Sequence, residues 1–189
     1  HDSVTRPIFG DGATATLLVA EEADEPLLHS FVFGTDGSRY DKLIIPAGGS
    51  KNPPRRTPEK ITTDERGNVR SNYDATMDGQ AITFFTLREV PPLVEQVLQK
   101  ANLTRSQLDY CIFHQANKFM LEYVQQKCKL MDVPFYNDIC KTGNTVSSTV
   151  PLGIEAVCKR NEKTLRRVML AGFGVGLSWA GCIANLERM

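Results

Sequence analysis

The chain has 189 residues, of which 41% are hydrophobic and 23% are charged, as is usual for a globular protein with one good-sized core. Lys and Arg total 22, Asp and Glu total 22, and the formal net charge at pH 7 is therefore zero. This balance gives no indication of nucleic-acid binding. No apolar run approaches the roughly 20 residues that a membrane helix needs, so we expect neither a nucleic acid nor a membrane as a partner.

Five cysteines are scattered through the sequence without C-x-x-C spacing. Such an odd, unpatterned set favours reduced thiols and a cytoplasmic protein over a disulfide framework or a zinc site. Cys111, Cys128, Cys158 and Cys182 fall in predicted strands or helices, and we interpret them as core residues. Cys140 is the remaining candidate for a reactive thiol, but nothing near it in the sequence indicates activation.

The first part of the sequence predicts strands and a surface excursion. Residues 8–20 predict a tight turn around Asp11 followed by a strand. Residues 28–34 and 42–45 predict two further strands separated by turn-forming residues. Residues 46–72 form a long polar stretch rich in Gly, Pro and Arg, which we interpret as an excursion over the surface.

The rest of the sequence predicts helices that alternate with strands. Residues 80–101 carry apolar side chains at helical spacing and predict a long helix, which Pro91 and Pro92 should kink or split. Further helices are predicted over residues 118–130 and 145–160, and further strands over residues 110–113, 134–137, 166–172 and 177–185. Because the last two strands adjoin without a helix between them, we expect an α/β fold with a mixed sheet.

His114 directly follows the predicted strand 110–113, and Asn117 is a suitable N-cap for the next helix. Ligands bind at the carboxyl ends of strands in open α/β sheets, and the positive end of a helix dipole disfavours a charged imidazole. We therefore expect a neutral His114 that donates one N–H. The structural alternative is a histidine packed at a strand end with a backbone partner.

Asn144 lies in the segment Gly143-Asn144-Thr145, thirty positions beyond His114 and ahead of a predicted helix. Its amide donates N–H without bringing a charge, and the pair fits the stabilisation of a developing oxyanion. A turn residue or N-cap is nevertheless the more frequent role for such an asparagine. No convincing nucleophile accompanies the pair, so the sequence predicts half of an active site.

Residues 171–179 (AGFGVGLSW) form a glycine-spaced loop between two predicted strands. The spacing differs from the dinucleotide-binding fingerprint, and no helix follows. Glycines in this loop would let backbone N–H groups approach a reacting carbonyl. Taken alone, the loop is better interpreted as a tight hairpin turn.

Together these motifs resemble the ketoacyl-ACP synthase III family of the thiolase superfamily. The match spans nearly the whole chain and runs in order through FGDGATATLL at 9–18, MDG at 77–79, FHQAN at 113–117, GNTVSSTVPL at 143–152 and GFGVGLSWA at 172–180. The combination is highly specific, whereas GDG or MDG alone carries no information.

The resemblance implies a protein of two similar halves, each a mixed five-stranded sheet with helices on both faces. Residues 23–189 would be the C-terminal thiolase-like domain, and residues 1–22 would hold the last strand of the missing N-terminal half. The family's nucleophilic cysteine would lie in that half, so the chain alone would be inactive. The implied activity is that of a 3-oxoacyl-ACP synthase III, an acyltransferase that condenses an acyl thioester with malonyl-ACP by decarboxylation in fatty acid biosynthesis.

By resemblance, His114 and Asn144 donate to the malonyl thioester oxygen as the enolate forms. The backbone N–H of Val175 contributes to a second oxyanion hole, at a position where many relatives have glycine. Phe173 shapes the entrance to the reactive cysteine, and Asn117 and Gly79 line the pantetheine tunnel. These roles are implied by the family match and not by the spacing of the residues.

The implied partners are acyl carrier protein, acyl-CoA, the N-terminal half and, at full length, a second copy in a homodimer. CoA and carrier-protein thioesters are substrates, and we expect no cofactor and no metal. Relatives often carry a basic residue for the carrier protein soon after HQAN, where this chain has Lys118 and Phe119. Two alternatives remain: a non-condensing relative that binds acyl-CoA or acyl-ACP, and a synthase III-like enzyme of secondary metabolism.

Overall fold

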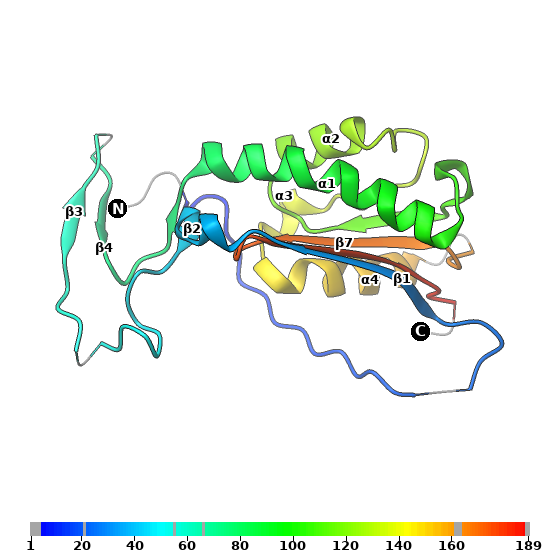
Figure 1. Cartoon of the computed structure of the whole chain (residues 1–189), viewed down its shortest axis with the longest axis horizontal. Coiled ribbons are helices and arrows are strands. Elements are labelled where there is room, and N and C mark those ends of the chain that lie inside the picture. Colours follow the sequence, from blue (N-terminus) through cyan, green and yellow to red (C-terminus); the bar gives the residue numbers. More distant parts are fainter. Residues whose placement is uncertain (1–4, 21, 55, 66, 161–163, 188–189) are drawn as a thin grey trace.

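The computed structural model describes residues 5–20, 22–54, 56–65, 67–160 and 164–187. Its centre is a four-stranded sheet in the order β1-β8-β7-β6 (Figure 1). The strands are β1 (Leu28–Thr35), β6 (Tyr110–Phe113), β7 (Val168–Gly174) and β8 (Ser178–Ala184). β8 is antiparallel to both of its neighbours, whereas β6 and β7 are parallel, so the expected mixed sheet is confirmed.

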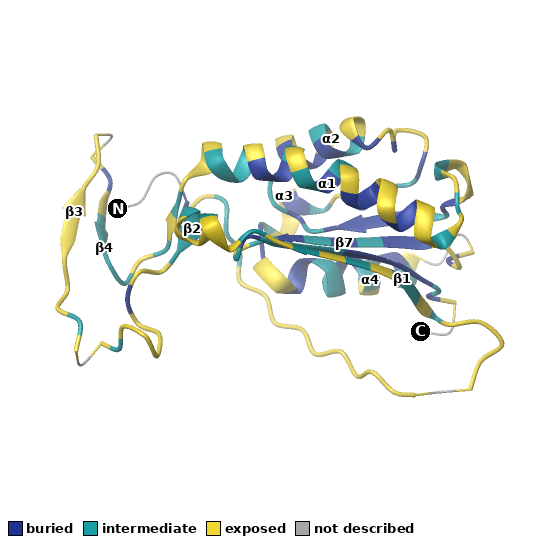
Figure 2. Ribbon diagram, viewed as in Figure 1, coloured by how far each residue is buried: buried dark blue, intermediate teal, exposed yellow. Residues whose placement is uncertain are grey.

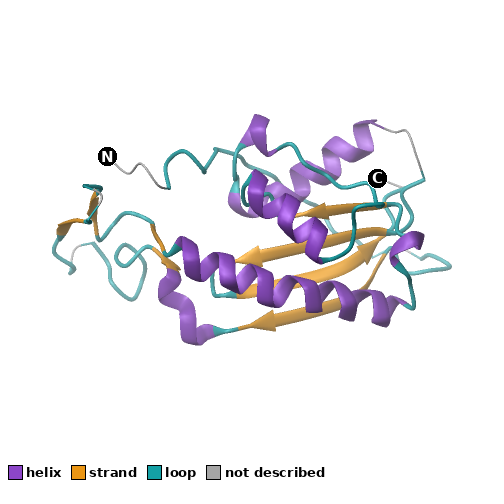
Figure 3. Cartoon of the chain, turned by 90° about the horizontal axis from the view of Figure 1, so that it is seen from above, coloured by secondary structure: helices purple, strands orange, loops and turns teal. Residues whose placement is uncertain are grey.

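Helices cover both faces of this sheet, as expected for the fold class. α1 (Gly79–Ala101) and α2 (Lys118–Lys127) lie on one face, and α4 (Thr149–Arg160) lies on the other (Figure 1). Figure 3 looks onto the sheet and shows α1 running along the strands. The short α3 (Ile139–Thr142) and three 3₁₀ helices, η1 (Gly37–Lys42), η2 (Arg105–Gln107) and η3 (Val146–Ser148), lie in the connections.

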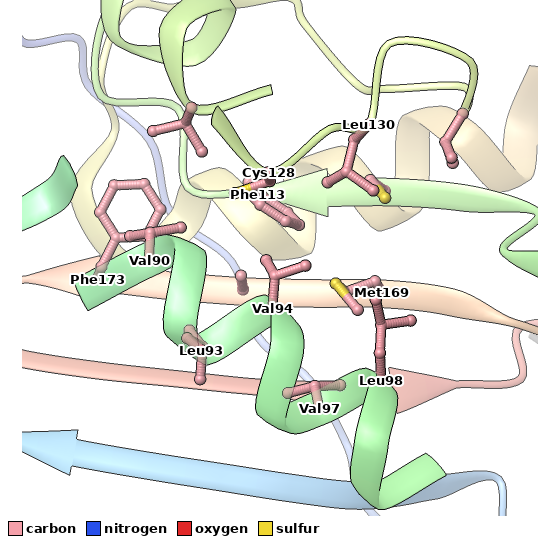
Figure 4. Packing of buried hydrophobic residues seen from close by; sticks show 14 of the residues in the cluster. Val90, Leu93, Val94, Val97, Leu98, Phe113, Cys128, Leu130, Met169 and Phe173 are labelled. Carbon is pink, nitrogen blue, oxygen red and sulfur yellow. The ribbon is translucent and has the colours of Figure 1, made fainter. Parts of the chain in front are cut away.

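The strand alternation divides the core into two layers. Met169 and Ala171 of β7 belong to the cluster beneath α1 and α2, whereas Val168 belongs to the cluster beneath α4. Alternate residues of a strand point to opposite faces, so one strand serves both layers. Figure 4 shows the first cluster, in which Val94 and other buried residues of α1 lie over the sheet near Phe113 and Phe173 (Figure 4).

The fifth strand of the expected sheet is present only as an isolated bridge. Phe135 forms a single parallel bridge with Cys111 of β6. The N–H of Cys111 donates to the Pro134 carbonyl at 2.8 Å, and the N–H of Tyr136 donates to the Cys111 carbonyl at 2.9 Å. The predicted strand 134–137 therefore lies where expected but is too short to count as a full strand.

The described residues do not form the strand that the sequence predicts within residues 8–20. Only Phe9 is bridged, to Asn144, and residues 11–20 are exposed and unpaired (Figure 2). A strand needs a neighbour for its backbone N–H and C=O groups, and no described strand pairs with residues 11–20. Their contacts include Ser148, whose hydroxyl donates to the Gly12 carbonyl and accepts from the Thr14 hydroxyl, both at 3.3 Å. Residues 1–4 and 21 of the predicted N-terminal segment lie outside the described residues.

α1 is one continuous helix of 23 residues, so the expected split at Pro91 and Pro92 does not occur. Asp78 caps its start by accepting the N–H of Ala81 at 3.0 Å, and Asn102 ends it in the left-handed conformation. One face of the helix is buried against the sheet on both sides of the proline pair. This packing holds the helix together where two backbone donors are missing.

The polar stretch 46–72 is largely exposed, as expected, but contains a hairpin that the sequence analysis did not predict. β3 (Ile61–Thr63) pairs with β4 (Val69–Ser71), and the hairpin stands apart from the sheet (Figures 1 and 2). β2 (Leu43–Ile44) pairs with β5 (Thr76–Met77) at its base. Among the described residues, none of the helices has the length and apolar character needed to cross a membrane.

Candidate active site

His114 is positioned by the end of β6. Its backbone N–H donates to the Ala171 carbonyl of β7 at 2.8 Å, which continues the pairing of the two strands beyond Phe113. The next residue, Gln115, is 1% exposed, and its side chain forms hydrogen bonds to the backbone of two segments. Its amide donates to the carbonyls of Phe113 and Tyr136 and accepts the N–H of Asp138. Gln115 therefore has a structural role: its side chain links the end of β6 to the segment of residues 136–138.

The imidazole of His114 has one polar side-chain partner and one aromatic partner. Nδ1 lies 2.7 Å from the hydroxyl of Thr149, and the ring meets Phe173 edge to face, with centroids 5.5 Å apart. Burial lowers the pKa of His114 to about 4, whereas a hydrogen bond to the Val146 carbonyl acts in the opposite direction. The ring is therefore neutral at pH 7, chiefly because it is desolvated.

Asn144 is 8% exposed, and its carboxamide has a fixed orientation. The N–H of Val146 donates to Asn144 Oδ1 at 2.9 Å, so the amino group points elsewhere. In the part of the chain that the structure describes, no hydrogen bond occupies this amino group. The turn role considered for Asn144 is thus confirmed. It uses only the side-chain oxygen, so both N–H groups of the amide can donate to a ligand.

His114 and Asn144 belong to one continuous network. Val146 donates its N–H to Asn144, and its carbonyl accepts the Thr149 hydroxyl at 2.9 Å, while that hydroxyl also contacts His114. Val146 occupies the left-handed region at φ 55° although it is β-branched, a conformation that costs about 1–3 kcal/mol. The strained residue orients the partners of both candidate donors.

A second segment, residues 8–12, holds the backbone of Asn144. Gly10 N–H donates to the Asn144 carbonyl at 3.0 Å, and Asn144 N–H donates to the Ile8 carbonyl at 2.9 Å. A Cβ on Gly10 would lie 1.9 Å from the carbonyl oxygen of Thr142. The glycine is therefore needed for close approach of two backbones, and the tight turn predicted here is wrong.

The other predicted site residues lie outside this network. Val175 occupies the turn between β7 and β8, where its side chain is 60% exposed; this confirms the hairpin. Asn117 caps α2 by accepting the N–H of Met120 at 2.8 Å, which leaves its amino group available. Gly79 is the first residue of α1, and open space lies where a Cβ would point. Only Phe173 of the remaining candidates contacts His114 directly.

The cysteines in the core show no sign of activation. Burial raises the pKa of Cys111, that of Cys128 to about 12 and that of Cys182 to about 11. Cys140 is exposed on α3. Among the described residues, no three or more His, Cys, Asp or Glu side chains gather where they could hold a metal ion.

Sequence reasoning missed Thr149, Val146 and Gln115. The last lies within the FHQAN motif, and the other two lie within GNTVSSTVPL, so the motifs were the available signal. The contact between Thr149 and His114 joins residues 35 positions apart, and no local pattern reports it.

Two comparisons of sequence address the family. Residues 98–186 match the family model described as 3-oxoacyl-[acyl-carrier-protein (ACP)] synthase III C terminal. The chain is also 33% identical over 188 residues to the beta-ketoacyl-[acyl-carrier-protein] synthase III of Lactococcus lactis subsp. lactis (strain IL1403), a match that covers 98% of this chain and 54% of that protein. The chain belongs to the ketoacyl-ACP synthase III family.

Solved structures of the family share the fold. A 3-oxoacyl-(acyl-carrier-protein) synthase III gives a TM-score of 0.81 at 38% identity, over 88% of this chain and 50% of that one. The synthase III of Pseudomonas aeruginosa PAO1 gives a TM-score of 0.72 at 28% identity, and the match covers 97% of this chain and 52% of that one. The chain spans about half the length of these relatives. It corresponds to the C-terminal, thiolase-like half of a ketoacyl-ACP synthase III.

Proposed function

We propose that the chain is the C-terminal half of a 3-oxoacyl-ACP synthase III, which condenses an acyl thioester with malonyl-ACP in fatty acid biosynthesis. The observation that carries this proposal is the network of Asn144, Val146, Thr149 and His114. It connects a neutral imidazole with a carboxamide whose amino group is unused, through the shared partners Val146 and Thr149. The family membership supplies the reaction that such a pair would serve.

In the proposed reaction, malonyl-ACP loses CO₂, and the electrons of the broken C–C bond move onto the thioester oxygen as an enolate. Nε2–H of His114 and the amino group of Asn144 donate to this oxygen. Each such donor contributes about 3–4 kcal/mol by analogy with other oxyanion holes. Neither donor carries a charge, so the site stabilises the anion without transferring a proton to it.

The enolate carbon then attacks the acyl group held as a thioester on the family's cysteine. We assign to the Val175 N–H one of the two donors for the resulting oxyanion; its exposed position in the β7–β8 turn leaves it accessible. Phe173 would shape the entrance and fix the imidazole plane. Asn117 and Gly79 would line the pantetheine tunnel, Asn117 through the amino group that capping leaves free.

The nucleophile would belong to the preceding half, so we propose that residues 1–189 alone are inactive. Residues 1–22 would contain the last strand of that half, and residues 23–189 would form the C-terminal domain. Leu17, Leu18 and Val19 are 86%, 74% and 71% exposed, which suits a strand whose neighbours lie elsewhere in a longer protein. The whole enzyme would be a cytoplasmic homodimer that uses acyl-CoA and acyl carrier protein and needs no cofactor.

A non-condensing relative that only binds acyl-CoA or acyl-ACP is the second candidate. It is favoured by Val175, which stands where many relatives have glycine, and by Phe119, which is 69% exposed where relatives often carry a basic residue. An enzyme of secondary metabolism would keep the chemistry and change only the product. The nucleophilic cysteine separates the two classes, because a binding module would not need it.

The test uses the full-length protein with malonyl-ACP and measures release of CO₂. His114→Ala and Asn144→Ala should each reduce the rate by ~10²-fold or more. His29→Ala is the matched control, because His29 lies on the edge strand β1 and should leave the rate unchanged. Full decarboxylation by both site variants would refute the assigned roles, and a wild-type protein without decarboxylation would favour the binding module.

A further inference from the structure

We propose that Thr149 is a positioning residue that fixes the tautomer and the ring orientation of His114, an inference that rests on the proposed function. Thr149 is the first residue of α4 and is only 2% exposed. Its hydroxyl lies 2.7 Å from His114 Nδ1. A buried hydroxyl either donates to a bare Nδ1 or accepts from Nδ1–H, so the direction of this hydrogen bond is linked to which ring nitrogen carries the proton.

The proposed role of His114 requires one particular tautomer. A neutral imidazole has one N–H, and donation from Nε2 leaves Nδ1 as a bare lone pair. A buried acceptor of this kind needs a donor. In that tautomer the Thr149 hydroxyl, 2.7 Å from Nδ1, is the donor, because the Val146 carbonyl that also faces the ring can only accept.

The hydroxyl has one proton and two possible acceptors, since the Val146 carbonyl lies 2.9 Å away. That carbonyl already accepts the backbone N–H of Thr149. It therefore keeps a partner when the hydroxyl donates to His114 instead. The reverse arrangement would place the proton on Nδ1 and leave Nε2 unable to donate to an enolate.

The surroundings of Thr149 keep this contact in one geometry. The backbone at Thr149 is helical, with φ −61° and ψ −40°, and a β-branched side chain has few rotamers in that conformation. Phe173 packs edge to face against the imidazole, with the ring centroids 5.5 Å apart. The ring thus contacts both a hydroxyl and an aromatic side chain, and rotation about its χ angles would break both contacts.

Three variants of the full-length protein test the proposal. Thr149→Val keeps the shape and removes the hydroxyl, whereas Thr149→Ser keeps the hydroxyl. Thr145→Val is the matched control: Thr145 is buried in the same segment, and its hydroxyl has no hydrogen-bond partner among the described residues. The tautomer is measured from the ¹⁵N chemical shifts of the His114 ring, and decarboxylation of malonyl-ACP is measured in parallel.

We expect the Nε2–H tautomer in the wild type, in Thr149→Ser and in Thr145→Val. Thr149→Val should populate the Nδ1–H tautomer and lower kcat by roughly tenfold, with little change in KM, because a hydrogen bond that matters in the transition state is lost. Thr149→Ser should recover most of that loss. The near-isosteric valine should also leave the melting temperature close to that of the wild type.

An Nδ1–H tautomer in the wild type would overturn the proposal, as would a Thr149→Val protein with unchanged ring shifts. The ¹⁵N chemical shifts of the ring do not depend on catalysis, so they test the role of Thr149 separately from the proposed function. If His114→Ala retained full activity while the shifts behaved as expected, the function would fail and the control of the tautomer by Thr149 would stand.

Discussion

At the scale of single residues, the burial of His114 links the candidate site to stability. The pKa of His114 is about 4 in the folded protein and about 6.5 in an unfolded chain. Between these values the unfolded state binds more protons, so the free energy of unfolding falls as the pH drops from about 6.5 to about 4. The loss contributed by this one group is about 3 kcal/mol.

The pH dependence can be measured by urea denaturation of the full-length protein between pH 4 and 7. His114→Gln should flatten the dependence in this window, because glutamine does not titrate. Asn144→Ala removes the neighbouring side chain but no titratable group, so it should keep the wild-type slope. An unchanged slope in His114→Gln would show that the imidazole is not buried as described.

The sequence predicted the chemical character of His114 and Asn144 but not the contacts that orient them. A strand end followed by a capped helix is a local pattern, and the neutral histidine expected from it is confirmed, although burial and not the expected helix dipole is the largest cause of the lowered pKa. The Thr149 hydroxyl and the left-handed backbone of Val146 act on His114 and Asn144 because the segment after β6 contacts the segment before α4. Contacts of this kind depend on the tertiary fold, and neither periodicity nor residue spacing predicts them.

At the scale of elements, α4 packs closely over β6 at Gly153, where a larger side chain would crowd its neighbours. A Cβ on Gly153 would lie 2.6 Å from Ile112 Cγ2 and 2.9 Å from Tyr136 Cδ1. Gly153→Ala should therefore destabilise the protein by about 1–2 kcal/mol, because overpacking a core outweighs the gain of about 1 kcal/mol in helix propensity. Thermal or urea unfolding of the full-length protein measures the change.

Gly79→Ala is the matched control for stability, since it also places alanine in a helix but meets open space. It should not destabilise the protein. Equal stability of both variants would mean that α4 can move away from the sheet without cost.

Most elements of the C-terminal part were predictable, because periodicity and caps are local properties. The strands ending at Phe113 and around the 175–177 turn, and the N-cap at Asn117, are confirmed. The continuity of α1 was not predictable, because packing on the sheet overrides the local effect of Pro91 and Pro92. The hairpin β3–β4 was also missed, since only six residues form its strands within a polar stretch.

At the scale of the whole molecule, the exposed apolar residues 17–19 bear on the proposed place of this segment beside a preceding half. Burying a leucine side chain stabilises a protein by about 1.5–3 kcal/mol, and Leu17 and Leu18 are 86% and 74% exposed. The proposed strand would bury such side chains against the preceding half. Amides of residues 13–19 should therefore exchange slowly with deuterium in the full-length protein and rapidly in residues 1–189 alone.

Hydrogen exchange monitored by mass spectrometry provides this measurement. Residues 11–20 are described as exposed throughout, so rapid exchange in the isolated chain is the reference state. Equally rapid exchange at full length would contradict the assignment of this segment to the other half.

The backbone hydrogen bonds between residues 8–10 and Asn144 affect how the protein could be divided into two complementing polypeptides. A cut within residues 22–27 would leave Ile8 and Gly10 on the first piece, although they hydrogen-bond Asn144 on the second. The carboxamide would then gain its backbone support only when the pieces reassociate. A split enzyme made in this way would couple catalytic output to assembly, and its product would serve as a reporter of complementation.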